Sequence, residues 1–169
     1  MKIKTTEKTI TDKEEGKTFL AQYGVYADFW KPEITDENNI DPLLKYKNQI
    51  GKLKEKFGYI SADVCAMKAD TPNLDTMLSA FTKEHHHTDD EVRFTVTGEG
   101  IFGINPHNEP PFEIHVEAGD LLLVPAYTRH WFNLTSEKNI CCIRVFKDNP
   151  KWEAIYEMPS SRESQLPAI

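Results

Sequence analysis

The sequence predicts an all-β fold with added helices, in which the strands form a sandwich or small barrel and the helices pack outside it. Two observations predict this class. After Tyr59 the chain becomes a series of short segments with alternating apolar and polar residues, separated by Gly, Pro, Asn and Asp. Before that point the apolar residues recur at helical spacing.

The length of 169 residues is enough for one ordinary domain and too little for two. We expect a single domain over residues 1–158, divided into a mainly helical part (1–58), a β-barrel (59–147) and a C-terminal extension (148–158). The remaining residues, 159–169, are polar and contain Pro and Ser, and we expect them to form a loose tail.

Two helices are expected in the N-terminal part. Thr11-Asp-Lys-Glu14 has the pattern of a capping box, and Gly24 is placed to end the first helix. For the second helix, Asp41 is the expected cap, Pro42 the first helical residue and Gly58 the end.

The expected strands follow one another closely, and Gly98-Glu-Gly100 is expected to be a tight turn between two of them. Their approximate ranges are Ile60–Lys68, Leu78–Thr82, Val92–Thr97, Ile101–Asn105, Phe112–Val116, Leu121–Val124, Trp131–Leu134 and Ile140–Phe146.

The formal net charge of −7 repels nucleic acids and anionic membrane surfaces, so neither is expected as a partner. The charged N-terminus, Met1–Glu15, has no apolar signal segment, and apolar runs such as Leu121–Ala126 are too short to span a membrane. A cytoplasmic location is therefore expected. Cys65, Cys141 and Cys142 are an odd set, so no disulfide framework is predicted in a reducing compartment. The alternative, a thiol nucleophile or thiolate ligand, is not supported by any Cys-x-x-Cys spacing.

The densest group of chemically active side chains is the segment from Glu84 to Glu91, which contains three histidines in succession. In an extended chain His85 and His87 point to one face and His86 to the other. Two imidazoles with the Glu91 carboxylate suit Fe(II), Ni(II), Mn(II) or Zn(II) rather than Ca²⁺ or Mg²⁺. The alternative is a solvated acidic loop, and His130 decides against it because it supplies a fourth ligand after Gly119-Asp120 and Pro125.

These two segments resemble the two motifs of the cupin family. His85-x-His87-x-x-x-Glu91 followed by Gly98 matches the first motif, and Gly119, Pro125 and His130 match the second. Ser79 and Tyr127 stand where the motifs have glycines. The resemblance implies a double-stranded β-helix, that is, a jelly-roll barrel, with the N-terminal helices packed outside.

Within the cupins the chain resembles the acireductone dioxygenases of methionine salvage. The matching strings are Glu84-His-His-His-Thr-Asp-Asp-Glu-Val-Arg-Phe94 and Val124-Pro-Ala-Tyr-Thr-Arg-His-Trp-Phe132. Gly24-Val-Tyr26 with Trp30, and Asn149-Pro-Lys-Trp152, fit the family outline.

The resemblance implies one Fe(II) or Ni(II) per chain, bound by His85, His87, Glu91 and His130 with two positions left for water or substrate. The implied substrates are O₂ and the enediol 1,2-dihydroxy-3-keto-5-methylthiopentene. Iron would give formate and 2-keto-4-methylthiobutyrate, whereas nickel would give carbon monoxide, formate and 3-methylthiopropionate. A monomer is expected by the same resemblance.

An anionic substrate requires local positive charge. Arg93 lies two residues from Glu91 and should share its face, so it is the first candidate for catalysis and substrate binding. Arg144 stands in an apolar run, where an unpaired charge is costly, and by resemblance it also faces the pocket. The alternative for Arg93 is a surface ion pair.

Phe81 and Phe132 are candidates for the methylthio end of the pocket, with plain core packing as the alternative. Asp90 is a candidate catalytic residue that either orients a ligand or acts as a base; a solvated bystander is the alternative. We place His86, His107 and His115 outside the site because no motif matches them.

Two other functions use the same residues. One is another cupin dioxygenase or a metal-dependent isomerase, because the scaffold alone does not select the reaction. The other is a non-catalytic binding protein in which Zn²⁺ closes the four ligands tetrahedrally as a structural metal.

Overall fold

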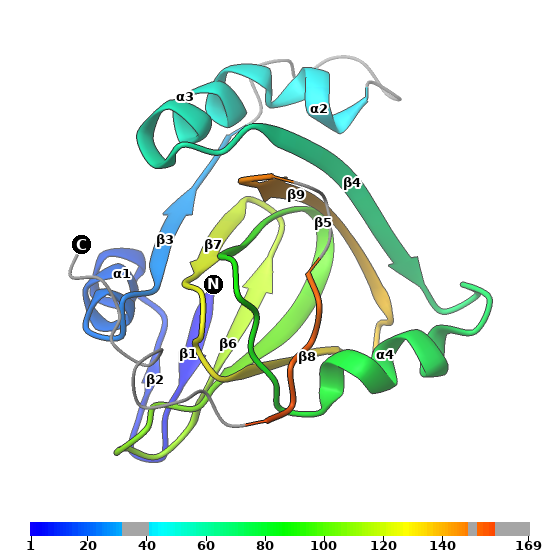
Figure 1. The fold of residues 1–169 in the computed structure, drawn as a ribbon. Coiled ribbons are helices and arrows are strands. Elements are labelled where there is room, and N and C mark those ends of the chain that lie inside the picture. The colour runs from blue at the N-terminus through cyan, green and yellow to red at the C-terminus, as the bar shows by residue number, and fades with distance from the viewer. Residues whose placement is uncertain (32–40, 149–151, 158–169) are drawn as a thin grey trace.

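The computed structural model describes residues 1–31, 41–148 and 152–157. Its strands form a curled nine-stranded sheet that encloses an apolar interior (Figure 1). The elements in chain order are β1 (Lys2–Lys4), β2 (Thr9–Ile10), α1 (Lys13–Ala21), β3 (Tyr26–Phe29), α2 (Pro42–Lys45), α3 (Lys47–Phe57), β4 (Ser61–Lys68), α4 (Leu74–Thr82), β5 (Glu91–Ile104), β6 (Phe112–Glu117), β7 (Asp120–Val124), β8 (His130–Leu134) and β9 (Asn139–Phe146).

Strand β5 joins the two sides of the barrel. Its first half pairs with β7 and β9, and its second half pairs with β6 and β8, all antiparallel. The register shifts between Thr95 and Thr97, where the strand has a bulge. The long strand β5 therefore contributes residues to the barrel interior on both sides.

Helices α2 and α3 cover the outside of the barrel, beyond β4 and β9 (Figure 1). Ile50 and Leu53 of α3 belong to the same buried cluster as Val92 and Phe94 of β5. Residues on the opposite face of the strands form a second cluster inside the barrel. The predicted all-β fold with helices outside is confirmed.

The predicted N-caps agree with the structure at one helix and are shifted by one residue at the other. Asp41 caps α2 by accepting a hydrogen bond from the Leu43 amide at 2.9 Å, with Pro42 in the first turn, as predicted. At α1 the cap is Asp12 instead of the predicted Thr11, and its side chain accepts from the Glu15 amide. Gly58 ends α3 with φ 75°, as predicted, but the single helix expected between Asp41 and Gly58 is two helices, α2 and α3, divided at Tyr46.

The predicted strand Leu78–Thr82 is wrong, because this segment is the end of helix α4. Leu74 and Leu78 are buried one helical turn apart, and Phe81 packs against the same interior cluster. A short apolar run has no clear period, so only its upstream partner Leu74 distinguishes helix from strand. Ser79, which stands in place of a motif glycine, lies on this helix.

The predicted turn at Gly98-Glu-Gly100 is also wrong, because β5 continues through it. Gly98 has φ 78° beside the bulge. Gly100 is required for close packing, since a Cβ there would lie 2.6 Å from the ring of Phe132. The glycines thus mark a bulge and a close approach between strands instead of a reversal of the chain.

The N-terminal part also contains strands that the sequence analysis did not predict. β1 pairs with β2 and β6, and β3 pairs with β7, so this part extends the barrel as well as covering it. The expected loose tail, 159–169, lies outside the described residues. Within the described part of the chain, no helix has the length and apolarity needed to cross a membrane.

Candidate metal centre

The four predicted ligands come from three segments that backbone pairing brings together. His85 and His130 form an antiparallel bridge, with both amide-to-carbonyl distances 2.9 Å. His87 is held by the Tyr127 amide, which donates to its carbonyl at 2.8 Å. Tyr127 has φ 62°, which explains why the related motif has a glycine there. Glu91 is the first residue of β5.

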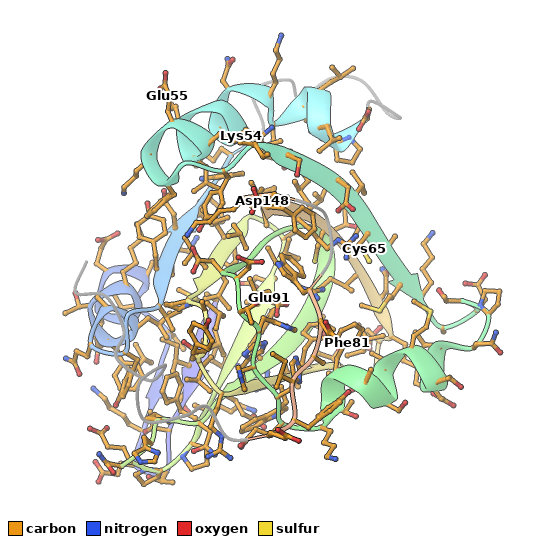
Figure 2. The ribbon with its side chains drawn as sticks, in the orientation of Figure 1. Lys54, Glu55, Cys65, Phe81, Glu91 and Asp148 are labelled. Carbon is orange, nitrogen blue, oxygen red and sulfur yellow. The ribbon has the colours of Figure 1, made fainter. Side chains whose placement is uncertain are left out.

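The ligand atoms of His85, His87, Glu91 and His130 all lie within 4.8 Å of one another. All four side chains are buried, with residue exposures of 3% or less. Figure 2 shows Glu91 pointing into the interior of the barrel. The structure therefore brings together the complete predicted ligand set, and His86 is turned to the other side, where its backbone pairs with Ile155.

The three imidazoles are oriented by backbone carbonyls. Each Nδ1 lies 2.7 Å from one carbonyl oxygen, that of Lys83 for His85, Glu153 for His87 and Thr128 for His130. Because a carbonyl only accepts, Nδ1 carries the proton, and a neutral ring then has its lone pair on Nε2. This is the tautomer arrangement typical of metal-binding histidines.

The Nε2 atoms converge on the carboxylate. Nε2 of His87 and Nε2 of His130 lie 3.0 and 2.9 Å from Oε2 of Glu91. Nitrogen lone pairs and carboxylate oxygens in one buried space require a cation among them. The donor set of three imidazoles and one carboxylate fits a divalent transition metal.

The protonation states favour metal binding. Burial lowers the pKa of His85 to about 4, so this imidazole is neutral near pH 7. Burial by itself raises the pKa of Glu91, but the charge of Arg93, together with the adjacent rings of His130 and His87, outweighs it and holds the pKa well below 4.5. His85 and Glu91 are thus in the forms that bind a metal ion.

Arg93 lies beside the ligands, as its spacing from Glu91 predicts. Its Nε donates to Oε1 of Glu91 at 2.5 Å, and the residue is 5% exposed. Attraction to Glu91 outweighs the effect of burial and raises the pKa of Arg93, so it is charged. Its guanidinium carbon lies 5.2 Å from the ring centroid of Phe132 and 5.3 Å from that of Trp152.

Arg144 is paired with Asp63, which was not among the predicted site residues. Its Nε donates to Oδ1 of Asp63 at 2.8 Å, and its Nη2 donates to Oδ2 at 2.6 Å. Its guanidinium carbon also lies 5.6 Å from the ring of Trp152. The sequence does single out Asp63 in one respect. By alternation along β4 it shares a face with Met67, which is buried in the barrel interior, and an acidic residue on that face indicates a charged partner.

Asp90 accepts several hydrogen bonds. Its carboxylate accepts from the Tyr59 hydroxyl at 2.8 Å and from the Ala126 amide at 3.0 Å, and it lies 3.2 Å from Lys147 Nζ. Its carbonyl accepts from Trp152 Nε1 at 3.1 Å. These contacts connect the ligand loop with the loop before His130 and with the C-terminal extension.

The two candidate phenylalanines differ in position. The ring of Phe81 is half-buried and its centroid lies 6.2 Å from that of His85. Phe132 is 1% exposed and packs against Phe102 at 5.0 Å. Phe81 therefore lies at the edge of the ligand cluster, and Phe132 lies beneath Arg93.

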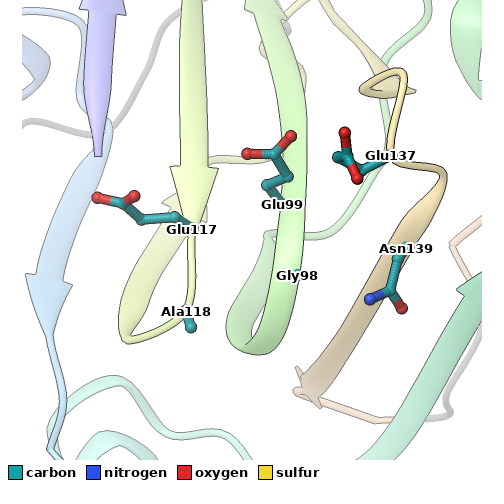
Figure 3. Close-up of a pocket in the computed structure, with 6 residues that line it drawn as sticks. All are labelled: Gly98, Glu99, Glu117, Ala118, Glu137 and Asn139. Carbon is teal, nitrogen blue, oxygen red and sulfur yellow. The ribbon is translucent and has the colours of Figure 1, made fainter.

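A second acidic region lies away from these ligands. Glu99, Glu117 and Glu137 line a surface pocket of about 440 Å³ together with Gly98, Ala118 and Asn139 (Figure 3). No histidine lines this pocket, and Glu117 and Glu137 are exposed.

A barrel with three imidazoles and one carboxylate converging in its interior defines a metal-binding cupin protein. The sequence matches the ARD/ARD' family over residues 2–154, and the chain belongs to that family. The acireductone dioxygenase of Sulfurihydrogenibium sp. (strain YO3AOP1) is 47% identical over 160 residues, 88% of this chain and 89% of that protein.

Two further comparisons agree with this assignment. The acireductone dioxygenase of Bacillus pumilus (strain SAFR-032) is 37% identical over 167 residues, covering 92% of this chain and 95% of that protein. The structure of acireductone dioxygenase from Bacillus anthracis with cadmium ion in its active center matches with a TM-score of 0.82 at 36% identity, covering 92% of this chain and 97% of that one. The family resemblance and the cupin fold predicted from the sequence are confirmed.

Proposed function

We propose that this chain is an acireductone dioxygenase, which cleaves 1,2-dihydroxy-3-keto-5-methylthiopentene with O₂ in methionine salvage. The observation that carries this proposal is that Glu91 contacts both the ligand histidines and Arg93. One carboxylate oxygen faces the Nε2 atoms of His87 and His130, and the other accepts from Arg93. A cation for an anionic substrate is thereby fixed next to the ligand set.

His85, His87, Glu91 and His130 would hold one Fe(II) or Ni(II) ion per chain. When bound, such an ion supplies the Lewis acidity and redox chemistry that the reaction of an enediol with O₂ needs. The cadmium in the Bacillus anthracis relative supports a divalent metal in a site of this kind.

Arg93 binds the anionic enediol in this proposal. Its Nε–H is used by Glu91, and a guanidinium has four further N–H donors in a fixed plane. Phe132 and Trp152 lie along the guanidinium and hold that plane in place. In a nearly water-free site these donors attract an enediolate oxygen much more strongly than they would in solution.

The other candidates have supporting parts. Arg144 is the second cation for the substrate, and Phe81 offers an apolar surface to its methylthio end. Phe132 packs its ring against the guanidinium of Arg93. For Asp90 we favour the orienting role over that of a base, because its carboxylate is already occupied by Tyr59, Ala126 and Lys147.

The products are part of the proposal. Iron-loaded protein is expected to give formate and 2-keto-4-methylthiobutyrate, and nickel-loaded protein carbon monoxide, formate and 3-methylthiopropionate. We further propose a cytoplasmic monomer, on the basis of the family resemblance.

The test is metal reconstitution followed by product analysis. Metal-free protein is loaded with Fe(II), Ni(II) or Zn(II), supplied with acireductone, and followed by oxygen uptake and carbon monoxide detection. Uptake with iron and nickel, and carbon monoxide with nickel alone, would support the proposal. Full zinc occupancy with no uptake after iron or nickel loading would favour a structural metal, and turnover of other enediols only would favour a different cupin enzyme.

A further inference from the structure

Three charged residues lie in one row across neighbouring strands on the interior side of the barrel. Asp63 of β4 is directly opposite Arg144 of β9, and Arg144 is directly opposite Arg93 of β5. Paired residues in an antiparallel sheet share a face. The face is the inner one, because the neighbours Val92 and Phe94 belong to the cluster beneath the outer helices.

The two arginines repel each other in this arrangement. Directly opposite side chains have Cβ atoms about 4.5–5.5 Å apart, and like charges at such positions are unfavourable. Both guanidinium groups also lie against Trp152, at 5.3 Å for Arg93 and 5.6 Å for Arg144. Each arginine therefore requires a carboxylate of its own.

The two carboxylates come from opposite sides of the row. Arg93 donates to Glu91, which is part of the ligand set. Arg144 makes two parallel hydrogen bonds with Asp63, at 2.8 and 2.6 Å. A bidentate pair of this kind fixes both the plane and the direction of the guanidinium. Without the Asp63 carboxylate, Arg144 would be free to move toward Glu91, the next carboxylate along this face.

We propose that Asp63 is a positioning residue, which acts on the substrate only through Arg144. It holds the guanidinium on the β4 side, away from Glu91, with the remaining donors available to an anionic enediol. This inference rests on the proposed function, in which Arg144 is the second substrate cation. A purely structural ion pair joining β4 to β9 is the competing explanation.

The test is a double-mutant cycle with Asp63→Asn and Arg144→Met in the metal-loaded enzyme. Asp63→Asn should raise the KM for acireductone about tenfold, as expected when a charged hydrogen-bond partner is lost, and leave kcat nearly unchanged. In the Arg144→Met background the same change should have no further effect on KM. Asp63→Glu, which keeps the charge, should recover part of the loss.

Asp28→Asn is the matched control. Asp28 is also a partly exposed carboxylate paired with a cation, Lys17, and the two side-chain exposures are 36% for Asp28 and 35% for Asp63. This control should leave KM unchanged. The Kd of acireductone without O₂, the metal content and the Tm are measured for every variant, so that a folding or loading defect is detected separately.

The results distinguish a failure of the positioning role of Asp63 from a failure of the proposed function. If the wild-type enzyme turns over acireductone but Asp63→Asn leaves both KM and the oxygen-free Kd unchanged, the positioning role is wrong and the proposed function stands. Additive effects in the cycle would likewise assign Asp63 a structural role. If the wild-type enzyme neither binds nor turns over acireductone with iron or nickel, the proposed function itself fails.

Discussion

Strand β5 carries a glutamate in each of two regions, the buried ligand cluster and a surface pocket, and the two glutamates differ in burial and in their partners. Glu91 is 3% exposed, with imidazoles on one side and Arg93 on the other. Glu99 lies with the exposed Glu117 and Glu137 at a surface pocket (Figure 3). Acidic residues gather in both places, but only the first has buried donors directed at a common point.

The difference between Glu91 and Glu99 shows what a carboxylate needs in order to be part of a metal site. An exposed carboxylate keeps its bound water, so it binds cations weakly and without a fixed coordination geometry. Glu91 has lost that hydration and receives in exchange one arginine and two imidazole nitrogens, at distances between 2.5 and 3.0 Å. Burial together with oriented partners, more than negative charge, distinguishes the functional region.

The largest expected effect comes from making the same substitution in both regions. Glu91→Gln should reduce iron- or nickel-dependent oxygen uptake by at least about 100-fold, since mutation of an outer partner of a ligand alone costs 10- to 100-fold. Glu99→Gln on the same strand should leave the rate unchanged. Similar losses in the two variants would mean that the regions do not differ as described.

Arg93→Met tests whether the buried arginine beside Glu91 binds the anionic substrate. It should raise the KM for acireductone about 10- to 100-fold, the range for losing a hydrogen bond to a charged group. Arg93→Lys should recover little, because an ammonium cannot bind Glu91 and substrate in one plane. Steady-state kinetics and metal content are the measurements; an unchanged KM at full metal loading would remove Arg93 from the substrate site.

Gly100→Ala tests the close packing between the two regions. The added methyl would overlap the ring of Phe132, so we expect a loss of about 1–3 kcal/mol in the free energy of unfolding. Gly51→Ala in α3 is the control: its Cβ meets no atom of the described residues within 4 Å, and a gain of up to about 1 kcal/mol is expected. Denaturant unfolding measures both, and an unaffected Gly100→Ala variant would argue against the continuous strand.

The smallest effect concerns the pH dependence of the metal-free protein. The pKa of His85 is about 4 in the folded state and 6.5 in the unfolded chain. Between these values the unfolded state binds more protons, so His85 makes stability fall as the pH decreases from 6.5 toward 4. Glu91 contributes only below 4.5, where its carboxylate would be protonated in the unfolded chain.

Thermal unfolding between pH 6.5 and 4.5 therefore isolates the histidine contribution. His85→Gln should show a flatter decrease of Tm over this interval than the wild-type protein. Equal slopes in the two proteins would contradict the lowered pKa.

The sequence predicted the centre of the site better than its surroundings. His85, His87 and Glu91 could be assigned because they are close in sequence and alternation fixes their faces. Arg93 followed from Glu91 by the same argument. Asp63 could not be assigned to Arg144, because their contact depends on the pairing of β4 with β9, which strand patterns do not specify.

The errors in the fold have a similar cause. The segment Leu78–Thr82 is too short to show a period, and its helix is defined by burial of Leu74 and Leu78 against the barrel. Gly98 and Gly100 have the composition of a turn, but their role depends on Asn139 and Phe132 from other strands. Local patterns predicted the elements, and contacts between distant segments decided these exceptions.

The central claim is that His85, His87, Glu91 and His130 bind one metal ion together. Calorimetric titration of the metal-free protein with Ni(II) tests it most directly. We predict one ion per chain for the wild-type protein and for Glu99→Gln, and at least about tenfold weaker binding when any one ligand is replaced by alanine. Wild-type affinity in the alanine variants, or loss of the ion in Glu99→Gln, would contradict the claim.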